Sequence, residues 1–210
     1  AVGADSYSSP IGRVYLFYNG SIITENASGA DVKITGEASS LLGSSLVSGD
    51  FNADGKTDLA VGAYVYSTST GRAYIFYNDG SLPTTAATAD VVITGEASSG
   101  FGTSLASGDW NADGKTDLAV GTWGYSSHTG RAYLFYNGSI ITENASGADI
   151  IITGETTDNY FATALVSGDF NADGKTDLAV GANAYSTNTG RTYLFYNGSI
   201  ITENASGADV

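Results

Sequence analysis

Oxygen-bearing side chains alternate with other residues in an acidic stretch, GDFNADGKTDLAVG or GDWNADGKTDLAVG, that occurs three times in this chain. Counting from its first aspartate, each copy carries Asp at positions 1, 5 and 9, Asn at 3, Gly at 6 and Lys at 7. Calcium takes about six to eight oxygen ligands, and position 7 of such a loop can supply a backbone carbonyl whatever its side chain. The pattern predicts three Ca²⁺ sites with the ligands Asp50, Asn52, Asp54, Lys56 and Asp58; Asp109, Asn111, Asp113, Lys115 and Asp117; and Asp169, Asn171, Asp173, Lys175 and Asp177.

Two further motifs with acidic or glycine-rich loops fit these residues less well. An EF-hand needs a glutamate at position 12 between two helices, whereas the first copy has Val61 there, in a strand-like run. A P-loop has four residues between its glycines, but Gly49 and Gly55 enclose five, and three aspartates would repel a phosphate. Asp, Asn and Gly also make good turns without an ion, yet every donor position is kept in all three copies. Calcium is therefore favoured, also over magnesium, which prefers tight octahedral geometry and its own waters.

The ion is expected to act structurally. No His or Glu recurs beside the loops as a base, and a turn filled with protein donors leaves little open coordination for chemistry. We therefore do not expect an enzyme.

The charge of the chain is concentrated in these loops. The net charge is −14, from 22 acidic and 8 basic residues, and the nine loop aspartates belong to that acidic set. Such a chain is a poor partner for nucleic acid, whose phosphates bind clustered Lys and Arg. No apolar run approaches the roughly 18–20 residues of a membrane span, so membrane insertion is not expected.

The loops recur at spacings of 59 and 60 residues, and periods of this size indicate propellers or other repeat arrays. Each period has two halves, and no linker separates them, so we predict a single array over residues 1–210. The loop-bearing halves are 33–59, 92–118 and 151–178, and they alternate with 1–32, 60–91, 119–150 and 179–210.

The sequence on either side of the acidic loops is typical of short strands. In residues 12–24 apolar side chains point to both faces, which is typical of a strand packed between two sheets. An Asn-Gly turn of the hairpin type follows in YNGS, and further strands are predicted at 30–36, 44–50 and 58–63. No sustained helical period occurs. Four short strands in a repeat of about 60 residues fit one propeller blade.

At this point the sequence resembles the FG-GAP repeat of integrin α-subunits and of many bacterial surface and secreted proteins. The stretch LLGSSLVSGDFNADGKTDLAVGA at 41–63 carries the likeness, although Phe-Gly itself appears only at Phe101-Gly102 and the usual proline is missing. The resemblance implies an all-β fold of propeller-type blades with four antiparallel strands, about three and a half repeats in a partial propeller or array. It also implies calcium in each loop and an extracellular or cell-surface location.

The repeat count raises the question of assembly. Integrin-type propellers close with seven blades, so three and a half repeats would be a window of a longer protein, or several copies would associate through open blade edges. The segment YNGSIITENASGAD is identical at 18–31, 136–149 and 196–209, and such sameness suits self-association. We expect a structural protein that forms or coats a fibre or surface array. The alternative is an adhesin or lectin-like propeller that recognises surface proteins or glycans.

Several side chains outside the loops have both a functional and a plain structural interpretation. Asn-x-Ser sequons could carry glycans, or simply form turns. Aromatic residues near 64–66, 123–125 and 185 could bind sugar or pack between blades. His128 is expected on a solvated loop. Arginines at the start of the aromatic strands could pair with the ITGE glutamates Glu37, Glu96 and Glu155, or stay solvated. The candidate glycosylation sites are Asn19, Asn26, Asn137, Asn144, Asn197 and Asn204.

Overall fold

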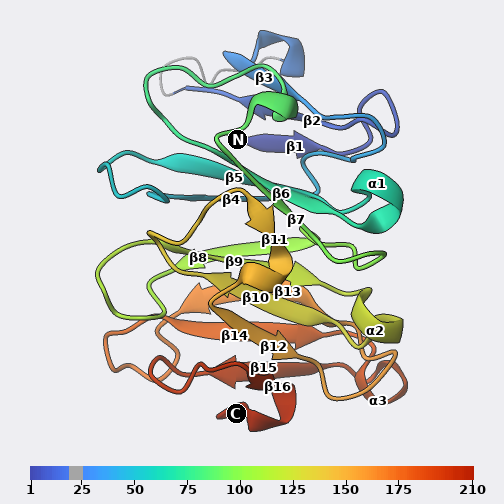
Figure 1. Cartoon of the computed structure of the whole chain (residues 1–210), viewed down its shortest axis with the longest axis vertical. Helices are drawn as coiled ribbons and strands as arrows, with labels where there is room; N and C mark the ends of the chain where they lie inside the picture. The colour runs from blue at the N-terminus through green and yellow to red at the C-terminus, as the bar shows by residue number, and fades with distance from the viewer. Residues whose placement is uncertain (19–25) are drawn as a thin grey trace.

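A computed structural model describes residues 1–18 and 26–210. Figure 1 shows four sheets stacked as layers along the longest axis, in chain order from the N-terminus to the C-terminus. The two inner sheets contain the full set of four antiparallel strands, which confirms the predicted all-β fold of propeller-type blades.

The strands follow the predicted boundaries closely. The second sheet consists of β4 (Ser45–Gly49), β5 (Asp58–Ala63), β6 (Arg72–Phe76) and β7 (Val91–Thr94). The third sheet repeats this order with β8 (Ser104–Gly108), β9 (Asp117–Thr122), β10 (Arg131–Phe135) and β12 (Ile150–Thr153). The outer sheets are three-stranded: β1 (Val2–Ala4), β2 (Arg13–Leu16) and β3 (Val32–Thr35) form the first, and β13 (Phe161–Gly168), β14 (Asp177–Ala182) and β15 (Arg191–Phe195) the fourth.

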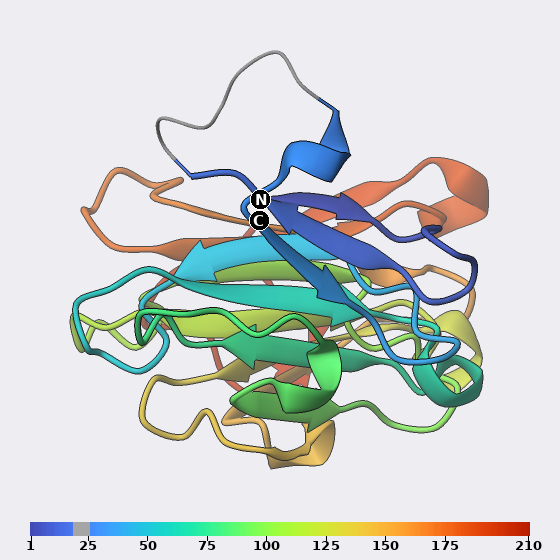
Figure 2. The ribbon, with the colours of Figure 1, turned by 90° about the horizontal axis from the view of Figure 1, so that it is seen from above.

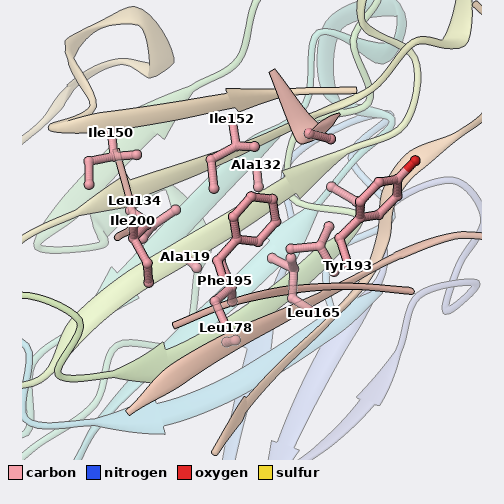
Figure 3. Close-up of a cluster of buried hydrophobic side chains, with 14 of the residues drawn as sticks. Ala119, Ala132, Leu134, Ile150, Ile152, Leu165, Leu178, Tyr193, Phe195 and Ile200 are labelled. Carbon is pink, nitrogen blue, oxygen red and sulfur yellow. The ribbon is translucent and has the colours of Figure 1, made fainter. Parts of the chain in front are cut away.

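Each inner sheet is buried on both faces, because successive side chains of its strands point to opposite faces and both sets are mostly apolar. We call the face that packs on the preceding sheet the leading face, and the opposite one the trailing face. In β10, Tyr133 and Phe135 pack in the cluster between the second and third sheets, whereas Ala132 and Leu134 pack between the third and fourth. Figure 3 shows this last cluster, with Phe195 of the fourth sheet against the small and branched side chains of the third.

The Asn-Gly turns at 137–138 and 197–198 do not form the expected hairpins, and the turn at 19–20 lies outside the described residues. Residues 136–139 do turn, with the Ser139 amide donating to the Tyr136 carbonyl at 3.0 Å. The chain then reaches back to the preceding sheet, where β11 (Glu143–Asn144) pairs in parallel with β7. In the same way β16 (Glu203–Asn204) pairs with β12. These reach-back segments close the outer edge of a sheet with residues of the next repeat.

The identical 14-residue segment therefore has an internal role in the copies that the structure describes in full. Ile140 and Ile200 are each 6% exposed, and Ala145 and Ala205 are fully buried between neighbouring sheets. Its sameness does not by itself argue for contacts between separate molecules.

Within residues 1–18 and 26–210, helical structure is limited to single turns. The turns α1 (Tyr66–Ser69), α2 (Tyr125–His128) and α3 (Tyr185–Asn188) contain consecutive residues with positive φ, so their backbone is left-handed in the middle. All three lie along one edge of the stack in Figures 1 and 2. The remaining turns are 3-10 helices at η1 (Ala27–Gly29), η2 (Ala86–Thr88), η3 (Ala145–Gly147) and η4 (Ala205–Gly207).

Candidate functional site

The three acidic loops join the first and second strands of successive sheets: β4 to β5, β8 to β9, and β13 to β14. They lie on the edge of the stack opposite α1, α2 and α3 (Figure 1). The strand pairs fix both ends of each loop, so the loops repeat in space as they do in sequence.

Backbone amides orient the carboxylates within each loop. Asp50 accepts from the Asp54 amide at 3.0 Å and from the Gly55 amide at 2.9 Å, and Asn52 Oδ1 also accepts from the Asp54 amide at 3.0 Å. Gly55 has φ +83°, which suits the glycine expected at position 6. The other two loops repeat these bonds at the same distances.

The side chain of Lys56 pairs with the aspartate at position 5 of its own loop. Its Nζ lies 3.2 Å from Asp54 Oδ2, although the lysine side chain is 50% exposed. The Lys56 backbone amide, which donates to Asp54 Oδ1 at 2.9 Å, is the main cause that lowers the pKa of Asp54. This bond therefore stabilises the charged form of the Asp54 carboxylate.

The aspartate at position 9 is buried in every loop: Asp58 is 2% exposed, and Asp117 and Asp177 are fully buried. Asp117 accepts from the backbone amides of Trp110 and Asn137, both at 2.9 Å. Burial nevertheless raises the pKa of Asp117 to about 6, and burial likewise raises the pKa of Asp58. A charged group in this position is costly unless a positive charge compensates it.

The donor set matches a hard cation in its chemistry. All donors are oxygens, from three aspartates, one asparagine and one backbone carbonyl in each loop. A carboxylate has about four lone-pair positions, and the amide bonds use only two of them at Asp50 and Asp117. Within residues 1–18 and 26–210, however, no three His, Cys, Asp or Glu side chains are gathered closely enough to hold an ion by themselves. The asparagine and carbonyl oxygens would have to contribute.

Sequence reasoning missed the asparagines that link neighbouring loops. Asn137 Nδ2 donates to the carbonyl of Asp50 at 3.0 Å and to that of Thr116 at 3.1 Å, so one amide joins the loops of two sheets. Asn197 makes the equivalent bonds to Asp109, Trp110 and Thr176. Both residues begin an Asn-Gly turn, and the turn alone accounts for an asparagine there, so the local sequence does not reveal the bridge.

We expect Asn137→Ala to destabilise the chain by about 1–3 kcal/mol, because two partly buried hydrogen bonds to backbone carbonyls are lost. Urea unfolding followed by circular dichroism measures this. Asn144→Ala is the matched control, since Asn144 lies in the same reach-back segment but is exposed. Equal effects of the two substitutions would show that the bridge between loops contributes nothing.

The sequons fall into different environments. Asn137 is 9% exposed, and the side-chain nitrogens of Asn137, Asn197 and Asn204 all donate to backbone carbonyls. A glycan would replace one of the two hydrogens on such a nitrogen, so it would remove at least one of these bonds at Asn137 and at Asn197. Asn26 and Asn144 are exposed, so glycosylation stays a prediction there. Asn19 lies outside the described residues.

Of the two possibilities that the sequence leaves open for the arginines at the strand starts, the structure shows ion pairs between blades, at three interfaces. Arg72 lies 2.8 Å from Glu37, Arg131 lies 3.0 Å from Glu96, and Arg191 lies 3.0 Å from Glu155. Each guanidinium also stacks on the tyrosine of the left-handed turn, at 3.5–3.7 Å from the ring centroid. Burial, with Glu96 as a further cause, raises the pKa of Tyr133 well above its usual value, so its hydroxyl stays a donor to that glutamate at 2.8 Å.

Three rings gather at the opposite edge of the stack from the acidic loops. Trp123, His128 and Tyr160 are nearly parallel, with centroids 4.8–5.6 Å apart. His128 also lies 3.0 Å from Asp158 and its side chain is 41% exposed, so it is stacked as well as solvated. Trp123 belongs to the aromatic positions expected from the sequence.

The fold and the loops together define a repeat array of stacked propeller-type blades with an acidic loop in each full repeat. Comparison with known families agrees: the FG-GAP repeat matches residues 42–76, 101–135 and 161–195. These matches cover half of the chain, and the chain belongs to the FG-GAP repeat family.

Curated relatives share the repeats but are much longer. Phosphatidylinositol-glycan-specific phospholipase D of Bos taurus is 34% identical over 175 residues, which is 75% of this chain and 21% of that protein. Integrin alpha-M of Mus musculus is 35% identical over 70% of this chain and 13% of its own length. Integrin alpha-PS2 of Drosophila melanogaster is 34% identical over 75% and 12%. The chain thus spans about a fifth or less of the length of these relatives.

The FG-GAP repeat is a structural, non-catalytic module, and the phospholipase matches this chain only in its repeat region. In the part of the chain that the structure describes, no helix has the length and apolar character needed to cross a bilayer.

Proposed function

We propose that the chain is a calcium-stabilised extracellular structural repeat module that forms or coats a fibre or a cell-surface array. The observation that carries the proposal is the threefold acidic loop, with one donor set and one pattern of hydrogen bonds at the corner between two strands. Sites of this kind in extracellular modules have dissociation constants of about 10⁻⁴–10⁻³ M, so they fill where calcium is abundant.

A bound dication would supply charge compensation. The carboxylates of Asp50, Asp54 and Asp58 belong to one loop, and repulsion from the first two is among the causes that raise the pKa of Asp58. Asp58 also accepts from the amides of Phe51 and Asn78, which follow the ends of β4 and β6. Compensating its charge would therefore stabilise the sheet corner itself.

Terbium luminescence tests the loops directly. Trp110 lies inside the second loop and is 2% exposed, so it is placed to sensitise a lanthanide bound there. We expect Tb³⁺ emission on excitation of tryptophan, displacement by millimolar Ca²⁺, and loss of the signal in Asp113→Asn. Emission that calcium does not displace, or that survives the substitution, would contradict calcium binding. Negative-stain images with and without chelator test the fibre or array role.

A binding module is the second candidate, and the ring cluster of Trp123, His128 and Tyr160 favours it. Aromatic faces beside polar groups are suited to sugars or to protein side chains. The loops of this cluster also differ between repeats, with Tyr64 and Asn183 at the position of Trp123. Calcium-dependent binding of a monomer to a glycan array, abolished by Trp123→Ala, would favour this candidate over the structural role.

A further inference from the structure

Neighbouring acidic loops share hydrogen bonds through a single asparagine. The backbone amide of Asn137 donates to Asp117 Oδ1 at 2.9 Å, at position 9 of the second loop. Its side-chain nitrogen donates to the backbone carbonyl of Asp50, at position 1 of the first loop, at 3.0 Å, and to that of Thr116 in the second loop at 3.1 Å. One residue therefore contacts the first expected calcium ligand of one loop and the last expected ligand of the next.

The second and third loops are joined in the same way and by more bonds. The backbone amide of Asn197 donates to Asp177 Oδ1 at 2.9 Å. Its side-chain nitrogen donates to the carbonyls of Asp109 at 3.1 Å and of Trp110 at 3.0 Å. Trp110 Nε1 in turn donates to the carbonyl of Asp177 at 3.2 Å. The second loop is thus bonded to both of its neighbours.

The backbones of neighbouring loops are also closely packed. A Cβ added at Gly49, directly before Asp50, would lie 2.6 Å from the methyl carbon of Thr116 in the second loop. A Cβ added at Gly108 would lie 2.7 Å from the methyl carbon of Thr176 in the third. A loop that moves at its first ligand must therefore move its neighbour or break the bridge between them.

This arrangement lets one loop prepare the next for an ion. The carboxylates of Asp50, Asp54 and Asp58 repel one another unless a positive charge lies between them. A bound dication would hold the loop together, and with it the Asp50 carbonyl that accepts from Asn137. Asn137 would then already be fixed where it holds Asp117. The second loop would lose less conformational entropy when it binds its own ion, which is a source of positive cooperativity.

We propose that calcium binding is positively cooperative between neighbouring loops, and that the side chains of Asn137 and Asn197 couple them. The proposal rests on the calcium binding proposed above and adds how the sites regulate one another. Charge alone predicts the opposite sign. Three aspartates and one lysine leave each loop with two negative charges, which a dication cancels, so a filled loop attracts the next ion less than an unfilled loop does.

The calcium affinity of the second loop can be measured separately, because Trp110 lies within it and sensitises terbium there. Displacement of terbium by calcium is followed at about 0.15 M salt, where exposed charges are screened beyond about 8 Å. Asp54→Asn disables the first loop without changing the second. We expect it to weaken calcium binding to the second loop roughly fivefold, at the lower end of allosteric couplings.

Asn137→Ala completes a double-mutant cycle with Asp54→Asn. In the Asn137→Ala chain, we expect Asp54→Asn to cause no further weakening at the second loop, because the bridge is already absent. Asn144→Ala is the matched control, since Asn144 lies in the same reach-back segment but is exposed. In the Asn144→Ala chain the fivefold effect should remain.

The same cycle on the other side uses Asp173→Asn and Asn197→Ala. Disabling the third loop should again weaken calcium binding to the second. Asn197→Ala should reduce this effect without abolishing it, because the bond from Trp110 to the Asp177 carbonyl remains.

Two results would overturn the proposal. The first is an affinity of the second loop that Asp54→Asn leaves unchanged or strengthens, a measurement that does not depend on the Asn137→Ala chain. The second is an equal weakening with and without the Asn137 side chain. Either result can occur in a chain that binds calcium. Terbium emission that calcium does not displace from the unmodified chain would instead contradict the calcium part of the proposed function, so the two failures are distinguishable.

Discussion

Removing calcium should lower the thermal stability of the chain by a large amount. With dissociation constants of about 10⁻⁴–10⁻³ M, calcium at ten to a hundred times these values contributes roughly 1.4–2.7 kcal/mol for each site. Three sites together then give about 4–8 kcal/mol, which corresponds to a shift of roughly 10–30 °C in Tm for a chain of this size. Differential scanning calorimetry in calcium and in chelator measures the shift.

A variant that neutralises one carboxylate in each loop tests whether the change in Tm comes from calcium bound in the loops. The triple variant Asp54→Asn, Asp113→Asn and Asp173→Asn should lose the response to calcium. In chelator its Tm should stay close to that of the unmodified chain, because the substitutions at Asp54 and Asp113 remove charges that repel the buried Asp58 and Asp117, while the change at Asp54 also gives up the charge that the Lys56 amide stabilises. Sodium chloride at matched ionic strength is the control, since screening alone acts on all exposed charges. A Tm that is the same with calcium and with chelator would contradict the role of the loops.

Replacing one glycine by alanine should have different effects on stability in the two inner sheets and in the fourth sheet. A Cβ at Gly121 would lie 2.3 Å from the carbonyl oxygen of Ala162 in the following sheet, and at Gly62 it would lie 2.0 Å from that of Gly102. At Gly181 the nearest atom would be 3.5 Å away, an ordinary contact. None of these three glycines has a positive φ, so steric fit alone separates them.

We therefore expect Gly121→Ala and Gly62→Ala to destabilise the chain by about 3 kcal/mol or more, since backbone atoms of two sheets must move apart. Gly181→Ala should be neutral or stabilising by up to about 1 kcal/mol, because alanine restricts the unfolded chain. Midpoints of urea unfolding, with unchanged slopes, measure the difference. Similar losses of stability at all three positions would show that the close approach between sheets is not what excludes a side chain there.

The close approach at these glycines also explains why the FG-GAP motif has small residues in both of its parts. Gly62 lies within β5, and Gly102 precedes β8 with φ +89°. The Gly102 amide donates to the carbonyl of Gly121 in its own sheet at 3.2 Å, while its carbonyl oxygen lies against Gly62 of the preceding sheet. The two parts of the motif meet at each contact between sheets, where side chains would keep the backbones apart. Ala162, which stands at the position of Gly102, also adopts a positive φ of 63°.

The sequence predicted those elements that are specified by residues close together along the chain. Alternating apolar residues located β4 and β5 within one residue, whereas the sequence left open whether the strand-start arginines pair with the ITGE glutamates, as they do in the structure. The path of residues 140–149 was not predictable in this way. A reach-back segment is specified by burial of Ile140 and Ala145 against another repeat, and such burial leaves no period in the segment itself. The asparagine bridges were missed for the same reason, because Asn137 acts on residues that lie far away along the chain.

The reach-back segments also bear on how such a gene could grow or shrink. The segments at 136–149 and 196–209 are identical, and each fits the sheet before it. Unequal crossing-over in steps of one period would therefore join one copy to the other without a mismatched junction. We expect natural variants of this array to differ by whole periods, with breakpoints free to fall almost anywhere within them.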